Sequence, residues 1–319
     1  MTLMTNHPTP QDHEEGAETP TLQGFAGYMT HDSFSKASSP TAVGEEYRRL
    51  SRQQLEGLEQ RLGERDKQAL AAIQRHRYLL TSQVQRLYFT ESSTQSAALR
   101  ATSRALKKLK EFGPIDHLAR RIGGVRAGSG ALIWYLTHAG ERLLRLNTKG
   151  ASPIKRFFEP SPLFLAHTLA VADIAIQIAE LCREQYSPKL TLLQTEPECW
   201  RVYSEYGNML SLKPDLFAIT TSGPYEDRWF IEVDLDTESP SKIVEKCERY
   251  HKYYRSGLEQ QEAEVFPLTV WIVPTTERKE KLLRCIREAF EKQRKLFVVI
   301  TGNELRSLIC QGGEEDSLC

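Results

Sequence analysis

A group of acidic residues lies in the second half of the chain. Asp215 is followed, after a turn, by the segment Trp229–Asp236, in which apolar residues alternate with Glu232, Asp234 and Asp236. Side chains alternate between the two faces of a strand, so this pattern predicts a β-hairpin with three carboxylates on one face and Asp215 at the start of the partner strand. Crowded carboxylates repel each other, and a cation that prefers oxygen ligands relieves the repulsion. The spacing therefore predicts a Mg²⁺ or Mn²⁺ site at Asp215, Glu232 and Asp234.

The net charge of zero conceals two oppositely charged parts of the chain. Residues 66–156 hold 17 Lys or Arg and 5 Asp or Glu, a net charge of +12, so the remaining residues together carry −12. A basic segment joined to an acidic one indicates a module that binds a polyanion beside a module with a different task.

Length and composition are those of an ordinary globular protein with room for two domains, since the chain has 319 residues, 40% hydrophobic and 26% charged. The polar N-terminus does not resemble a signal peptide. Polar residues interrupt the longest apolar run, residues 163–182, which fits a partly buried helix better than a membrane span. The six cysteines show no regular spacing, which favours reduced thiols. These features predict a cytoplasmic protein without a membrane partner.

The first half of the chain predicts a small helical module. Residues 1–43 are rich in Pro, Ser, Thr and Gly and are expected to be a disordered tail. An amphipathic helix at 44–63 carries leucines near a 3.5-residue repeat, so it either packs on its own domain or forms a homodimer. Residues 64–150 then read as three helices, with Thr81 capping the second, followed by two strands around a glycine-rich tip and a further helix. This order is typical of a winged helix-turn-helix DNA-binding domain.

The third helix of that module predicts the contact with double-stranded DNA. Leu99, Leu106 and Leu109 form its expected buried stripe, and basic residues lie mostly on the other side. The N-terminal residues of such a helix meet base edges in the major groove. The alternative is a charged face that only contacts solvent. The predicted DNA-binding residues are Gln95, Ser96 and Arg100 at bases, Arg104 on the same basic side of the helix, Lys107 and Lys108 near the phosphates, and Arg120, Arg121 and Arg126 on the hairpin.

The second half predicts a mixed α/β module. A linker at 151–161 precedes a domain at 162–305, and residues 306–319 are expected to be a C-terminal tail. The elements expected in the domain are a helix at 163–186, a strand at 190–195, the acidic hairpin, a helix at 240–257, a strand at 268–273, a helix at 278–293 and a strand at 296–300.

This order, with Pro-Asp on one strand and Glu on the next, resembles the PD-(D/E)xK, or restriction-endonuclease-like, fold. The whole chain resembles the replication-relaxation family of plasmid and mobile-element proteins, related to mobilisation relaxases. The segments that carry the resemblance are Arg77–Thr81, Leu106–Leu109, Tyr135–Gly140, His167–Asp173, Pro214-Asp215, Glu232–Leu235 with Thr237-Glu238, and Lys246 to Tyr250. The resemblance implies an α+β multidomain protein, a winged helix followed by an α/β nuclease-like domain, that binds DNA in plasmid replication or mobilisation.

The resemblance also implies catalytic residues, with one departure. Asp215 and Glu232 match the metal-binding pair of the nuclease fold, but Asp234 stands where that fold normally has a lysine, and an Asp cannot supply positive charge. Either Asp234 adds a carboxylate to the metal site, or a lysine from the following helix takes over, Lys246 in preference to Lys242. Further candidates are Glu180 as a metal ligand, His167 as a weaker one, and Tyr250, Tyr253 or Tyr254 as a nucleophile.

Two functions remain open at this point. The first is a metal-dependent enzyme in which Asp215, Glu232, Asp234 and Lys246 nick DNA at a plasmid origin. The second is a DNA-binding regulator or accessory factor that carries a degenerate nuclease-like domain.

Overall fold

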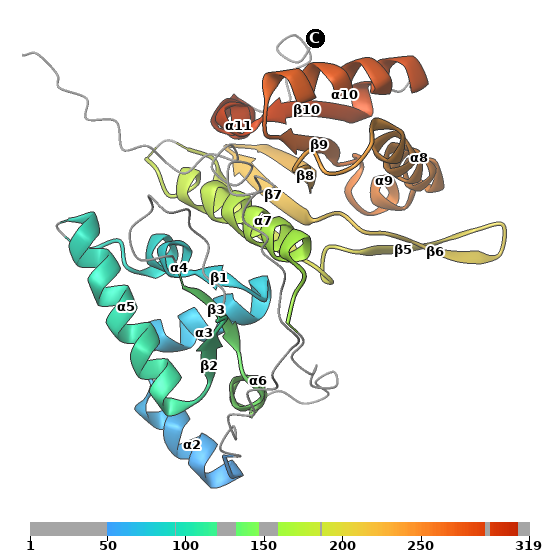
Figure 1. Cartoon of the computed structure of the whole chain (residues 1–319). Helices are drawn as coiled ribbons and strands as arrows, with labels where there is room; N and C mark the ends of the chain where they lie inside the picture. The colour runs from blue at the N-terminus through green and yellow to red at the C-terminus, as the bar shows by residue number, and fades with distance from the viewer. Residues whose placement is uncertain are drawn as a thin grey trace, which may run out of the picture.

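The computed structural model describes residues 50–92, 94–119, 132–146, 159–185, 187–290 and 294–311 as a mixed α+β protein (Figure 1). The expected N-terminal tail at 1–43, the glycine-rich tip with Arg120, Arg121 and Arg126, and most of the linker lie outside these residues.

The N-terminal module combines helices with a three-stranded antiparallel sheet of order β1-β3-β2. The long helix α5 lies along one side of the module, with α4 next to it (Figure 1). The elements in chain order are α2 (Arg52–Arg61), α3 (Glu64–His76), β1 (Leu79–Leu80), α4 (Thr81–Tyr88), α5 (Gln95–Phe112), β2 (Ile115–His117), β3 (Ile133–Leu136) and α6 (His138–Leu144).

Local signals explain where these helices begin and end. The Thr94 hydroxyl accepts a hydrogen bond from the Ala97 amide at the start of α5, and Gly113 ends the helix with a φ of 99°, which a glycine adopts without strain. The expectation that Thr81 caps α4 was wrong. Its hydroxyl accepts a hydrogen bond from the Trp134 indole at 2.9 Å, and the N-cap residue is Leu80.

The leucines of α2 pack on the module's own core. Leu55, Leu58 and Leu62 are buried against α3, α6 and β3 residues of the same chain. The described part of the amphipathic helix thus follows the first of its two alternatives. The leucine stripe that suggested a homodimer packs within the core of its own module.

The C-terminal module is built on a five-stranded sheet of order β10-β9-β8-β7-β4. Strands β8, β9 and β10 run parallel, whereas β7 pairs antiparallel with β8 and with β4. The helices are α7 (Pro162–Leu181), α8 (Pro240–Ser256), α9 (Leu258–Ala263), α10 (Thr276–Ala289) and α11 (Leu305–Gln311), with 3-10 turns η2 (Arg294–Leu296) and η3 (Gly302–Glu304). The sheet strands are β4 (Lys189–Thr195), β7 (Leu216–Ser222), β8 (Tyr225–Val233), β9 (Leu268–Val273) and β10 (Phe297–Thr301).

Two elements of this module differ from the sequence prediction. A separate antiparallel ribbon, β5 (Arg201–Glu205) with β6 (Asn208–Leu212), protrudes from the body and was not expected (Figure 1). The segment from 306, expected to be a tail, continues α11 as far as Gln311. Leu308 and Ile309 of this helix are buried in the core beneath the sheet, so the module extends past residue 305.

Helix α7 joins the two modules. Ala170, Ile174 and Ile178 pack against the five-stranded sheet, while Ala172 and Ile176 belong to the core of the N-terminal module. On the opposite face of the sheet, α8 and α10 cover a second core. Among the described residues α7 is the one helix whose length and composition would suit a membrane span. Its contacts on both sides are those of a buried core helix.

Candidate functional site

Asp215 and Glu232 meet at the ends of two neighbouring strands. Leu216 of β7 pairs with Ile231 of β8, and the Asp215 amide donates a hydrogen bond to the Ile231 carbonyl at 3.1 Å. Continuing this register by one residue sets Asp215 across from Glu232. Both residues are buried, with exposed fractions of 9% and 3%. The structure therefore brings together the carboxylates expected to hold a metal.

Glu232 is held in a nearly closed environment on the α8 side of the sheet. Its Oε1 accepts a hydrogen bond from the Tyr250 hydroxyl at 2.6 Å, and Lys246 Nζ lies 3.6 Å from its Oε2. Burial and the charge of Asp215 raise the pKa of Glu232 from 4.5 to about 8, although Lys246 and Tyr250 oppose the shift. A buried carboxylate with so high a pKa marks a site where a cation would be favoured.

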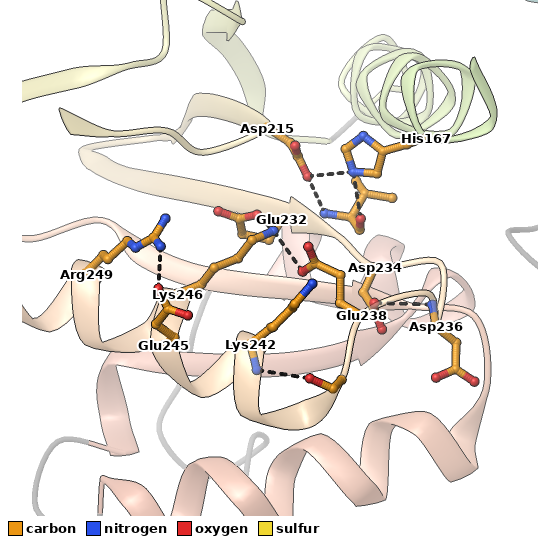
Figure 2. Close-up of polar contacts among 12 residues, drawn as sticks. His167, Asp215, Glu232, Asp234, Asp236, Glu238, Lys242, Glu245, Lys246 and Arg249 are labelled. Atoms are coloured by element: carbon orange, nitrogen blue, oxygen red, sulfur yellow. Dashed lines mark hydrogen bonds and ion pairs between the residues drawn. The ribbon is translucent and has the colours of Figure 1, made fainter. Parts of the chain in front are cut away.

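Lys246 is the cation that α8 directs to this site, as the sequence suggested. Its ammonium also lies 3.1 Å from Glu238, in the loop before α8 (Figure 2). Burial lowers the pKa of Lys246, but the carboxylates of Glu232, Asp215 and Glu238 outweigh it and raise the pKa above the ordinary value. The side chain therefore stays charged near neutral pH.

His167 contacts Asp215 from α7, on the other side of the strand end (Figure 2). Its Nε2 lies 3.3 Å from Asp215 Oδ2 and 3.0 Å from the Val233 carbonyl. Burial lowers the pKa of His167, but the charge of Asp215 and their hydrogen bond raise it to about 9. In the sequence His167 was the weaker candidate, since a histidine on an apolar helix is more often a core residue with its own hydrogen-bond partner. Its partner Asp215 lies 48 residues further along the chain.

Asp234 does not join the carboxylate pair, which corrects the expected third ligand. Strand β8 ends at Val233, and Asp234 forms two hydrogen bonds with the buried guanidinium of Arg278, at 2.6 and 3.1 Å. Asp236 has a φ of 58° and also pairs with Arg278. The alternation of faces that the sequence suggested therefore stops before these two residues, because the strand has already ended.

Glu180 is also engaged elsewhere. Arg86 of α4 pairs with Glu180 and with the buried Asp173, both on α7, and Gln177 donates a hydrogen bond to Asp173 at 2.7 Å. This polar stripe of α7 faces the N-terminal module rather than the metal site. Its ion pairs link the two modules.

The tyrosines that were considered as nucleophiles have structural roles in two cases. Burial and the nearby Glu232 raise the pKa of Tyr250 well above its ordinary value, so its phenol keeps its proton. Tyr253 donates a hydrogen bond to Glu259 at 3.0 Å, and burial raises its pKa as well. Tyr254 is partly exposed and packs edge-on against Phe266.

The residues predicted to contact DNA on α5 lie on its exposed side. Lys108 is partly engaged, since its ammonium lies 3.4 Å from Asp66. The expected buried position of Leu99 was wrong, because its side chain is 41% exposed, while Ala98 and Thr102 complete the buried stripe with Leu106 and Leu109. The exposed members of the predicted set are Gln95, Ser96, Arg100, Arg104, Lys107 and Lys108.

The donor set at the strand ends fits a hard divalent cation only in part. Asp215 and Glu232 offer carboxylate oxygens, and Mg²⁺ is commonly held by one or two carboxylates together with water and substrate phosphate. Within the described ranges, no group of three or more His, Cys, Asp or Glu residues is arranged to hold a metal ion. A cation here would therefore rely on Asp215 and Glu232, with its remaining ligands supplied from outside the protein.

Comparisons with known proteins give one strong match. No curated protein matches the chain. Solved structures of the restriction endonuclease FokI, one of them bound to DNA, align with 12% identity over 82% and 86% of this chain, with TM-scores of 0.26 and 0.24. This chain spans only 44% and 47% of those FokI chains, and TM-scores this low do not establish a common fold. The family described as Replication-relaxation matches residues 70–269, and the chain belongs to that family.

Proposed function

We propose that the protein binds double-stranded DNA in plasmid or mobile-element replication and nicks one strand with a divalent metal ion. In this proposal residues 64–150 act as a winged helix, and the C-terminal module carries a nuclease-like site of the PD-(D/E)xK type. The observation that carries the proposal is the meeting of Asp215 and Glu232, two buried carboxylates on adjacent strands, with Lys246 at 3.6 Å from Glu232.

Each side chain of the site has a task in this reaction. A divalent cation held by Asp215 and Glu232 would supply Lewis-acid chemistry at the phosphodiester. Lys246 carries positive charge next to Glu232 and is positioned to stabilise the negative charge that develops on the phosphate. Tyr250 holds the Glu232 carboxylate by its hydrogen bond, and His167 holds Asp215 from α7. The lysine from α8 supplies the charge that Asp234 cannot.

DNA docking is assigned to α5. This helix has a capped N-terminus, a buried stripe and an exposed side that carries Arg100, Arg104 and Lys107. In helix-turn-helix proteins the second helix of the motif enters the major groove in this way. If about six phosphates are contacted, the affinity for DNA falls with salt with a log–log slope of about −5. A much flatter slope would count against docking through this basic surface.

A nicking assay tests the proposal. Supercoiled plasmid that carries the protein's own origin is incubated with Mn²⁺ and wild type, Asp215→Ala or Glu232→Ala. Open circles that form with wild type and are lost in both variants support the enzyme. Glu245→Ala is a matched control, because this carboxylate lies on α8 but is exposed and paired with Arg249. Supercoils that stay intact with wild type, while DNA binding is normal, reject nicking.

A non-catalytic regulator is the second candidate, and one observation favours it. Asp234 occupies the position of the usual lysine and is locked by Arg278, so this part of the site serves the fold. In that case Asp215→Ala would leave DNA binding and plasmid maintenance unchanged. Loss of plasmid maintenance with binding intact would reject the regulator.

A further inference from the structure

A pocket of about 210 Å³ lies beside the carboxylate site, between the two modules. Its walls come from the end of α3, from α7 and from the end of β4, and Asp215 forms part of its lining. At about 30 Å³ per water molecule, it has room for several waters or for a group the size of a phosphate with part of a sugar. A ligand here would therefore touch both the N-terminal module and the candidate metal site.

Positive charge predominates in the part of this pocket that α3 provides. Arg75 is exposed and forms no ion pair within the described residues, while Arg77 is only 4.0 Å from Glu196, at the limit of an ion pair. His167 lines the pocket on the α7 side and contacts Asp215. Two guanidinium groups that remain available suit an anion with several oxygen atoms, since arginine binds phosphate with two parallel hydrogen bonds.

His76 and Arg77 lie next to each other in the wall that the end of α3 provides. The His76 side chain lines the pocket at 8% exposure. Arg77 has a φ of 65° and a ψ of −47°, a strained conformation for a residue with a side chain. Such strain gathers at binding and catalytic sites.

The outer wall of the pocket is apolar. Phe164 is 42% exposed and lies with Val171 on the same side of α7. An exposed aromatic ring beside arginines is the combination that proteins use to bind single-stranded nucleic acid, in which bases stack on rings and phosphates meet the cations. A free phosphate ion would use the arginines but not the ring.

We infer that this pocket binds one nucleotide of the DNA strand next to the phosphodiester that is cut, with its phosphate on Arg75 and Arg77, a hydrogen bond from His76 and its base against Phe164. The inference rests on the proposed function, because Asp215 connects the pocket to the site of nicking. It assigns to the end of α3 a role in directing the strand, separate from the docking of duplex DNA by α5.

Strand binding without cleavage tests this inference. A fluorescent oligothymidylate of about six nucleotides is titrated with the full chain in EDTA, and anisotropy gives the affinity. Arg75→Ala and Arg77→Gly are each expected to weaken binding about tenfold, the effect of losing one charge-assisted hydrogen bond. Arg77→Lys keeps the positive charge but not the paired hydrogen bonds, so it is expected to lose less affinity than Arg77→Gly. Arg287→Ala is the matched control, since it is an exposed arginine on α10, across the sheet from α7.

Arg77→Gly also separates binding from folding. Glycine accepts a positive φ without strain, so this variant is expected to be at least as stable as wild type while it binds the strand less well. Equal affinities in all variants, or an equal loss in Arg287→Ala, would overturn the inference. Because the titration needs neither metal nor cleavage, a negative nicking assay with Asp215→Ala and Glu232→Ala as comparisons would reject the proposed function and leave this result intact.

Discussion

Replacing Glu232 with glutamine is expected to make the protein more stable at neutral and alkaline pH. In the folded protein the pKa of Glu232 is raised from 4.5 to about 8, first by burial and then by Asp215. Between these two pH values the folded state keeps a proton that the unfolded state has released. The free energy of unfolding therefore falls as the pH rises from 4.5 through 8.

The magnitude follows from the shift. At pH 7 the unfolded carboxyl is ionised and the folded one is still largely protonated, so the shift costs about 3 kcal/mol of stability. Glutamine keeps an oxygen that accepts the Tyr250 hydrogen bond but loses the attraction of Lys246. A net gain of about 1–3 kcal/mol is expected at pH 7 to 8, and close to none near pH 4.5.

Urea unfolding at several pH values, in EDTA, measures this gain. Glu238→Gln is the control, because Glu238 contacts the same Lys246 but is partly exposed, at 36% of its side chain. The reasoning is refuted if Glu232→Gln is no more stable than wild type at pH 8, or if the gain is the same at pH 4.5. Mn²⁺ should then stabilise wild type and not the variant, which links the cost of the buried carboxylate to its use as a ligand.

Three further outcomes are expected. Arg86→Ala should lower the free energy of unfolding by about 3–5 kcal/mol in urea, because Asp173 stays buried without its cation, whereas Arg52→Ala, which breaks an exposed pair, should cost less than about 1 kcal/mol. Burial and Arg75 lower the pKa of His76 to about 4, so the stability that its neutral form provides is complete above pH 6.5 and is lost as the pH falls toward 4. In His76→Gln the free energy of unfolding should lose about 3 kcal/mol less than in wild type over this pH range. An unchanged pH profile of stability would contradict the shift. Arg100→Ala should weaken binding to the specific DNA site by about 1–3 kcal/mol in a gel-shift titration, and an equal loss on random DNA would make Arg100 a phosphate contact.

Much of the fold could be predicted from hydrophobic alternation and helix signals. The hairpin of β7 and β8, with Asp215 before one strand and Glu232 near the end of the other, follows from a period of two in the sequence. Helix α5 follows from its threonine cap and its terminal glycine. These features depend on residues close together in the chain, where pattern and structure agree.

The remaining features depend on contacts between distant segments. Asp234 continues the alternating pattern, yet its partner Arg278 lies on α10, 44 residues away, and only the fold shows that the strand has ended. His167 reaches Asp215 from α7 in the same manner. Leu99 looked like a core residue because its helical spacing to Leu106 and Leu109 predicts one buried stripe, but Ala98 and Thr102 fill that face instead.

Helix α7 fixes the spacing between the two modules, because its side chains belong to both of their cores. Ala172 and Ile176 of this helix belong to one core, and Ala170 and Ile174 belong to the other. Neither module can therefore rotate relative to the other without exposing buried apolar side chains. In the proposed function, this rigid connection would hold α5 at a fixed distance from Asp215 and Glu232. If the protein acts as proposed, a nick would fall a constant number of base pairs from the DNA site that α5 contacts.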